Sequence, residues 1–133
     1  MSMMNMQQNT AGTFVPNEFF AMLGNLSRSD ADAADFGVVK VDDQGNIQLY
    51  NRYESQLAGI APNAAEGKNF FTQIAPCTNN GLFFGSFKKG VAAGNLNVAF
   101  PYTFTYKMTP TNIRAHLYRD QASGTNWVFV AKA

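Results

Sequence analysis

The last third of the chain alternates hydrophobic and polar residues with the period of a β-strand. Phe100, Tyr102, Phe104 and Tyr106 fall on one face of such a run, since every second residue of a strand points to the same side. Near the start of the chain, two shorter runs flank a polar turn that contains Gly45, which predicts a hairpin. In total the pattern predicts strands over residues 36–41, 47–50, 98–106, 113–119 and 127–131.

Between the second and third of these strands the pattern changes to that of short helices. Asn51 is placed to cap a helix over residues 52–57, which Gly59 would end. Asn63 is placed to cap a further turn that leads to Glu66. A longer helix ending at Gly94 is predicted by the helical spacing of Phe83, Phe84, Phe87 and Val91.

The N-terminal part has its own helical pattern. A short helix is predicted within residues 16–27, where the apolar residues on one face are Phe19, Met22, Leu23 and Leu26. Ser29 or Asp30 is placed to cap a second helical turn. We therefore expect a cap segment over residues 1–28 and the body of the domain over residues 29–133.

The order of elements is two strands, several short helices and three strands. This order is typical of an α+β fold of the PAS type, a five-stranded antiparallel sheet with short helices on one face. The N-terminal helical cap is an addition to it. Such a fold does not by itself assign a function.

Composition and charge exclude several classes of protein. A length of 133 residues with 46% hydrophobic residues suits one domain with a substantial core. Ten Lys and Arg balance nine Asp and Glu, and the basic residues are scattered, so no nucleic-acid partner is expected. No hydrophobic run is long enough to cross a membrane, and the Met-rich start lacks the features of a signal peptide. A reducing, cytoplasmic location is expected.

The chain has one cysteine, Cys77, which directly follows Pro76. The proline disfavours helical geometry at Ala75, so a helix over residues 70–74 should end there and Cys77 should open a polar loop. A lone cysteine in a reduced protein is most often a small buried hydrophobe. On the residues alone, both a structural and a reactive role for this thiol stay open.

An enzyme would need a base for this thiol, and His116 is the one histidine. Alternation directs Ile113, Ala115 and Leu117 toward the core, which leaves His116 as a surface imidazole. A nucleophile and base pair of Cys77 and His116 is therefore not expected, and neither is an enzyme.

From residue 36 to its end the chain resembles the photoactive yellow protein family, without a gap. The motifs that carry the resemblance are Gly45-Asn46-Ile47, Tyr50-Asn51, Glu54, Gly67-Lys68-Asn69-Phe70-Phe71, Ala75-Pro76-Cys77-Thr78, Gly94-Asn95-Leu96-Asn97, Tyr102-Thr103-Phe104, Tyr106, Met108-Thr109-Pro110-Thr111 and Trp127-Val128-Phe129-Val130.

The resemblance implies a blue-light photoreceptor with a covalent chromophore. Cys77 matches the cysteine that carries p-coumaric acid (4-hydroxycinnamic acid) as a thioester, and Tyr50 and Glu54 match the two donors to its phenolate oxygen. The matching pocket walls are Phe70, Phe104, Tyr106 and Met108. A PAS-type interaction or ligand-binding module without a covalent chromophore is the alternative. The resemblance also implies a downstream signalling protein as partner, and we expect a monomer or weak dimer.

The implied chemistry requires a particular protonation state of Glu54. A buried phenolate is costly unless donors satisfy it, so Glu54 must be protonated to donate. Burial and a neighbouring anion both raise a carboxyl pKa, which favours that state. The chain departs from the family pattern at Ala58, where a threonine is usual, and at Ile60, where an arginine is usual. These changes leave attachment intact but bear on colour and recovery rate.

Overall fold

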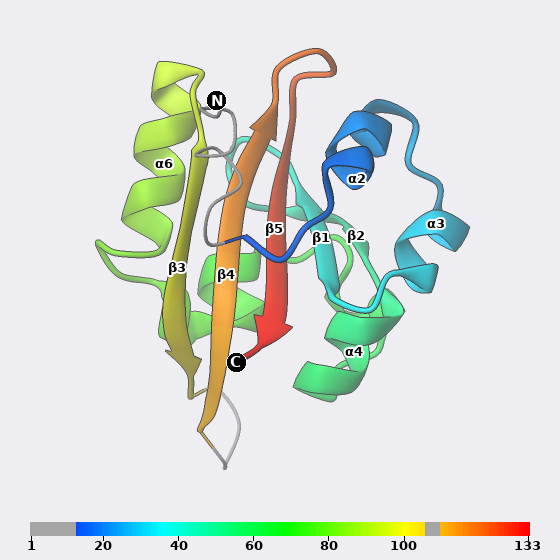
Figure 1. Ribbon diagram of the computed structural model, residues 1–133. Helices are drawn as coiled ribbons and strands as arrows, with labels where there is room; N and C mark the ends of the chain where they lie inside the picture. Colours follow the sequence, from blue (N-terminus) through cyan, green and yellow to red (C-terminus); the bar gives the residue numbers. More distant parts are fainter. Residues whose placement is uncertain (1–12, 106–109) are drawn as a thin grey trace.

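The computed structural model describes residues 13–105 and 110–133, which form one antiparallel sheet with helices on both faces (Figure 1). The sheet has the strand order β2-β1-β5-β4-β3. Its strands are β1 (Gly37–Val41), β2 (Ile47–Tyr50), β3 (Asn97–Phe104), β4 (Thr111–Asp120) and β5 (Thr125–Lys132). The predicted α+β, PAS-like sheet is confirmed, and β2 matches its predicted bounds.

Short helices cover the face of the sheet that holds the larger part of the core. They are α4 (Arg52–Ala58), α5 (Pro62–Ala65), the π-helical turn η2 (Phe70–Ile74), the 3₁₀ turn η3 (Pro76–Thr78) and α6 (Phe84–Ala93). Two of the predicted ends are confirmed, because Gly59 and Gly94 take the left-handed conformation that ends α4 and α6.

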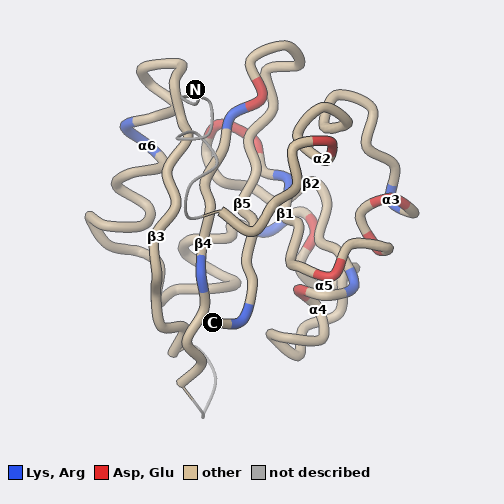
Figure 2. Tube along the Cα trace, viewed as in Figure 1, with Lys and Arg blue, Asp and Glu red and all other residues tan. Residues whose placement is uncertain are grey.

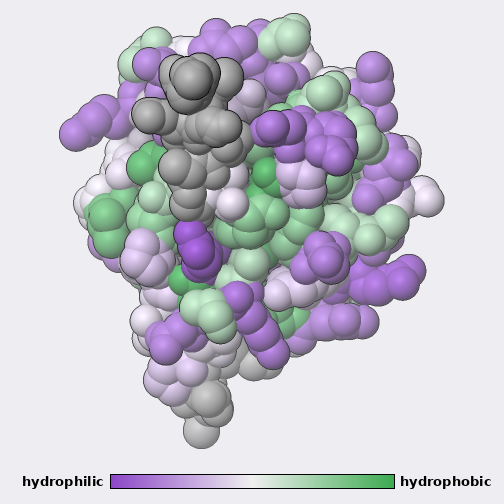
Figure 3. All heavy atoms as spheres, viewed as in Figure 1, coloured by the Kyte–Doolittle hydropathy of each residue, from purple (hydrophilic) through white to green (hydrophobic). Residues whose placement is uncertain are grey.

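The described part of the N-terminal cap lies on the opposite face, where the chain crosses in front of β4 and β5 (Figure 1). It contains α2 (Asn17–Met22) and the 3₁₀ turn η1 (Leu23–Asn25), and α3 (Arg28–Ala33) spans its predicted end. Leu23 is buried, and Phe19, Phe20 and Leu26 pack against the same cluster. Figure 3 shows hydrophobic residues gathered on this side, between the sheet and α2.

Three local predictions about helices were wrong. Met22 is exposed, because the chain tightens into the 3₁₀ turn η1 immediately after it and Phe20 packs inward instead. The capping residue of α3 is Ser27, in a reciprocal arrangement with Asp30. Asn63 lies inside α5, which starts at Pro62, a residue whose fixed φ suits the first helical position.

Two hydrophobic clusters follow from the alternation of the strands. The helix-covered face buries Val39 and Val41 of β1 with Ile113, Ala115 and Leu117 of β4. The cap-covered face buries residues that point to the other side of the sheet, among them Val38 of β1 and Trp127 and Phe129 of β5. The boundary between residues 28 and 29 that we predicted for the cap stays a prediction.

Charged residues of both signs are spread over the elements, with basic residues on α3, α6 and β4 and acidic residues among them (Figure 2). Within residues 13–105 and 110–133, no helix is long and apolar enough to span a membrane.

Candidate functional site

The first turn of α4 carries Glu54 into the interior directly after the end of β2. The side chain of Asn51 caps this helix, since its Oδ1 accepts a hydrogen bond from the Glu54 backbone N–H at 3.1 Å. Tyr50 precedes the cap and is completely buried. Its backbone N–H donates to a carboxylate oxygen of Glu66 at 3.0 Å, and Arg28 of α3 forms an ion pair with the same oxygen.

Glu54 is the most unusual group of the interior. Its side chain is fully buried, and neither carboxyl oxygen has a hydrogen-bond partner within the described part of the chain. Burial disfavours the charged carboxylate and raises the pKa of Glu54 to about 8. The carboxyl group is therefore protonated at neutral pH, and its O–H is available to an acceptor that the described residues do not supply.

Cys77 lies in the 3₁₀ turn η3 and not in an irregular loop as we predicted. Pro76 occupies the first position of the turn, and the Thr78 hydroxyl donates to the carbonyl of Ala75 at 2.6 Å. The thiol is free, and the side chain is partly buried against the larger core cluster. The turn thus holds the sulfur at the edge of the hydrophobic interior.

Tyr102 of β3 fixes this turn to the sheet. Its hydroxyl donates to the carbonyl oxygen of Cys77 at 2.5 Å and accepts from the Asn80 side chain at 2.6 Å. The Asn80 amide also donates to the Cys77 carbonyl at 3.2 Å. The backbone of Cys77 is therefore held from β3 and from the segment before α6.

Aromatic rings form part of the core cluster against which Cys77 packs. Phe70 of η2 and Phe104 of β3 are buried in the cluster that contains Tyr50, and Phe83 lies between them, with ring centroids 6.4 Å from Phe70 and 6.3 Å from Phe104. Three predicted site residues thus share one cluster, against which Cys77 packs. Tyr106 and Met108, the other two predicted pocket residues, lie outside the described residues.

Sequence reasoning missed Phe83 and Tyr102 as parts of the site. Phe83 was predicted only as a helical apolar residue, and it directly precedes α6. Tyr102 was placed on the correct face of its strand, and alternation gave that signal. Neither pattern shows that the tyrosine hydroxyl reaches the Cys77 carbonyl, because this contact joins segments 25 residues apart.

His116 is buried and not on the surface, so that prediction was wrong. It points toward the cap face of β4, where Phe20 lies at a ring-centroid distance of 5.4 Å. In its neutral form Nε2 donates to Asn97 at 2.6 Å and Nδ1 accepts from the Thr13 hydroxyl at 2.5 Å. Cys77 packs against the opposite face of the sheet, so these two residues do not form a nucleophile and base pair.

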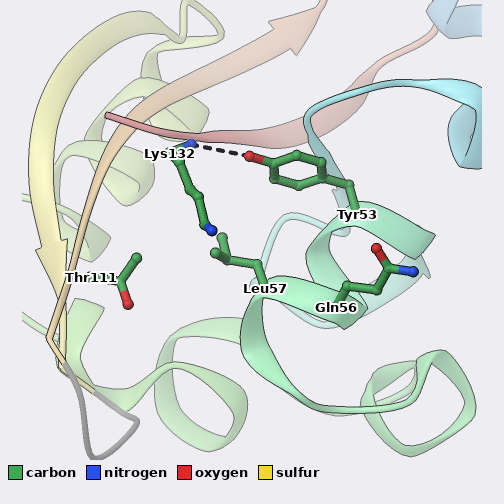
Figure 4. Close-up of a pocket in the computed structure, with 5 residues that line it drawn as sticks. All are labelled: Tyr53, Gln56, Leu57, Thr111 and Lys132. Atoms are coloured by element: carbon green, nitrogen blue, oxygen red, sulfur yellow. Dashed lines mark hydrogen bonds between the residues drawn. The ribbon is translucent and has the colours of Figure 1, made fainter.

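A surface cavity of about 370 Å³ opens between α4 and the ends of β4 and β5 (Figure 4). Its lining residues are Tyr53, Gln56, Leu57, Thr111 and Lys132. None of the predicted site residues that the structure describes lines it. Leu57 also packs against the larger core cluster, which contains Tyr50.

The two departures from the family pattern lie close to α4. Ala58, the last residue of this helix, is buried, and Ile60 is partly buried against the larger cluster. Both positions therefore present apolar side chains where the family pattern has polar ones.

Comparisons with known proteins identify the family of this chain and agree with its fold. The family model of the PAS fold matches residues 28–130. A photoactive yellow protein of Rhodothalassium salexigens is 39% identical over 110 residues, which cover 83% of this chain and 88% of that protein. A photoactive yellow protein of Rhodobacter capsulatus is 36% identical over 103 residues, which cover 77% of this chain and 83% of that protein.

Solved structures give the same result. The photoactive yellow protein domain of the sensor histidine kinase Ppr from Rhodospirillum centenum superposes with a TM-score of 0.80 at 35% identity, covering 85% of this chain and 99% of that chain. The PAS domain of the quorum-sensing receptor RpfR from Cronobacter turicensis shares the fold at a TM-score of 0.60 and 16% identity, covering 74% of this chain and 94% of that chain. Because relatives at 36–39% identity extend over most of both sequences, the chain belongs to the photoactive yellow protein family and is a PAS-fold photoreceptor of that family.

Proposed function

We propose that this photoreceptor carries p-coumaric acid as a thioester on Cys77 and that Glu54 and Tyr50 hold its phenolate oxygen. The observation that carries the proposal is the fully buried carboxyl group of Glu54, whose oxygens have no hydrogen-bond partner within the described residues and whose pKa burial raises to about 8. A carboxyl group left in this state loses hydrogen bonds that water would supply, which is unfavourable unless a ligand provides an acceptor.

The residues of the proposed site suit a phenolate. A protonated carboxyl group and a tyrosine hydroxyl both donate, and bonds to a charged oxygen are worth roughly 1.5–3 kcal/mol each. The aromatic rings of Phe70, Phe83 and Phe104 supply a dry, flat environment for a conjugated ring. Tyr106 and Met108 stay predicted pocket residues by resemblance.

Cys77 supplies the point of attachment. Its carbonyl is held by Tyr102 and Asn80, so the backbone that presents the thiol is fixed before attachment. A thioester forms when the thiolate sulfur displaces the leaving group of an activated p-coumaric acid, and the leaving group departs with the electron pair. A group attached at this turn would start beside the aromatic cluster, because Cys77 packs against it.

When bound, the p-coumaroyl group supplies absorption of blue light and a double bond that isomerises. Glu54 would supply, from one of its carboxyl oxygens, the proton that the phenolate oxygen accepts after this event. Loss of that proton leaves a carboxylate in a site where no described residue donates to it, at a cost of several kcal/mol. This cost favours movement of α4 and of the segments that hydrogen-bond to Asn51, which are α3 and the start of β1. We propose that this movement is the signalling change.

The alternative of a ligand-binding module without a covalent chromophore remains the competing function. Relatives of this chain are photoreceptors and sensor modules, and we propose that it likewise has no enzymatic activity of its own. We propose a downstream signalling protein as its partner, a monomer or weak dimer as its solution state, and the cytoplasm as its location.

Reconstitution tests the covalent site. The purified chain is incubated with an activated p-coumaric acid, and mass spectrometry and absorption are measured after removal of free compound. The proposal predicts a mass gain of one p-coumaroyl group and a yellow protein, both absent in Cys77→Ala. A yellow colour without a mass gain would support the non-covalent module instead. Cys77→Ser, which lacks the thiol but keeps a hydroxyl, separates thioester chemistry from simple loss of packing.

A further inference from the structure

β1 leaves a gap in the inward-facing row of the sheet. Val39 and Val41 point into the larger cluster, whereas Phe36 and Val38 belong to the cluster under the cap. By alternation Gly37 is the next inward position, and it is buried without a side chain. At the start of β1 the inward face of the sheet therefore lacks the side chain that any residue other than glycine would place there.

The carboxyl group of Glu54 fills this gap. A Cβ built at residue 37 would lie 2.3 Å from Oε1 of Glu54, far inside van der Waals contact. It would also lie 3.2 Å from Cβ and from the carbonyl oxygen of Val130, the partner of Gly37 on β5. The φ angle of Gly37 is not in the left-handed region, so space and not backbone conformation accounts for the glycine.

The two backbones that enclose the gap are tied together, so they do not separate freely. Asn51 Oδ1 accepts from the backbone N–H of Val38 at 2.9 Å and from that of Glu54 at 3.1 Å. A Cβ at residue 37 must therefore be accommodated mainly by displacement of the Glu54 side chain.

We propose that Gly37 is a positioning residue for the proton donor: its missing side chain holds the Glu54 carboxyl group against β1. The proposal rests on the function proposed above, in which Glu54 donates to the phenolate and later gives up its proton. Any larger residue at position 37 moves the donor atom away from the sheet and changes its distance to the acceptor.

The test starts in the chromophore-free protein. Infrared spectroscopy identifies the protonated carboxyl band of Glu54 as the band lost in Glu54→Gln. Gly37→Ala should shift or broaden this band, because the carboxyl group is displaced. Gly24→Ala is the matched control, since a Cβ there would lie 3.6 Å from the nearest atom, and it should leave the band unchanged. An unchanged band in Gly37→Ala would overturn the proposal.

A double variant separates positioning from general loss of packing. Glu54→Asp shortens the side chain by one methylene and withdraws the carboxyl group from position 37. If the clash is with Glu54, Gly37→Ala combined with Glu54→Asp should lose less stability than the sum of the single changes. Additive losses would assign the clash to Val130 and overturn the proposal. If Gly37→Ala alone does not fold, recovery of folding in the double variant supports the proposal, and failure of the double variant while Glu54→Asp folds contradicts it.

Reconstituted protein then gives the functional readout. Gly37→Ala should attach the chromophore normally at Cys77 but shift the absorption maximum, whereas Gly24→Ala should not. Failure of every variant and of the unaltered chain to attach a chromophore would overturn the proposed function and leave the infrared result on Gly37 standing.

Discussion

Asn51 accepts a hydrogen bond from the backbone N–H of Glu54 at 3.1 Å and at the same time ties this residue to the start of β1. Its Oδ1 also accepts from Val38 at 2.9 Å, and its Nδ2 donates to the carbonyls of Ala31 at 2.7 Å and Phe36 at 3.0 Å. One buried amide therefore links the helix of the proposed proton donor to α3 and β1.

Asn51→Ala should destabilise the protein strongly. The substitution leaves two backbone N–H groups and two carbonyls without their partner in a buried place, and a lost cap alone costs about 0.5–2 kcal/mol. We expect a loss of several kcal/mol in the free energy of unfolding, measured by denaturant titration. Asn63→Ala, at an exposed position inside α5, is the matched control. Equal stability of the two variants would contradict the role given to Asn51.

The chromophore-free protein should lose stability as the pH rises because of Glu54. Burial raises its pKa from 4.5 to about 8, so the folded state binds this proton more tightly than the unfolded chain. The contribution is fully present below about pH 4.5 and is lost progressively as the pH rises through 8. Glu54→Gln should remove this part of the pH dependence. If unfolding curves of both proteins change in parallel from pH 5 to pH 9, Glu54 is not held neutral.

His116 should lower the stability of the protein as the pH falls, whereas Glu54 lowers it as the pH rises. Burial lowers its pKa from 6.5 to about 4, so the imidazole is neutral when folded and takes up a proton on unfolding. Its unfavourable effect is absent above about pH 6.5 and grows as the pH falls toward 4. His116→Gln, which keeps a donor and an acceptor, should flatten the stability profile in this range. A profile identical to that of the unaltered chain would show that the imidazole is already solvated.

Local sequence signals predicted the elements well where one residue decides the geometry. Asn51 caps α4 and Gly94 ends α6, because a side-chain acceptor and a left-handed φ are local requirements. His116 was misplaced because alternation separates the two faces of a strand but does not show that the cap covers the second face. Met22 was misplaced because a 3₁₀ turn interrupts the helical period beside it.

The candidate site could be predicted only in part. Cys77, Tyr50 and Glu54 came from a resemblance in motifs, and their roles toward a chromophore stay predictions. The pairing of Gly37 with Glu54, and of Tyr102 with the Cys77 carbonyl, depends on how distant segments pack. No periodicity in the sequence encodes these distances.

The central claim is that Glu54 is the buried proton donor of a light-driven cycle, and light-minus-dark infrared spectroscopy of the reconstituted protein tests it most directly. The account predicts that illumination removes a protonated carboxyl band and produces a carboxylate band, that both signals return in the dark, and that Glu54→Gln lacks them. A light-induced loss of a protonated carboxyl band that persists in Glu54→Gln would show that another group supplies the proton, and would contradict the account.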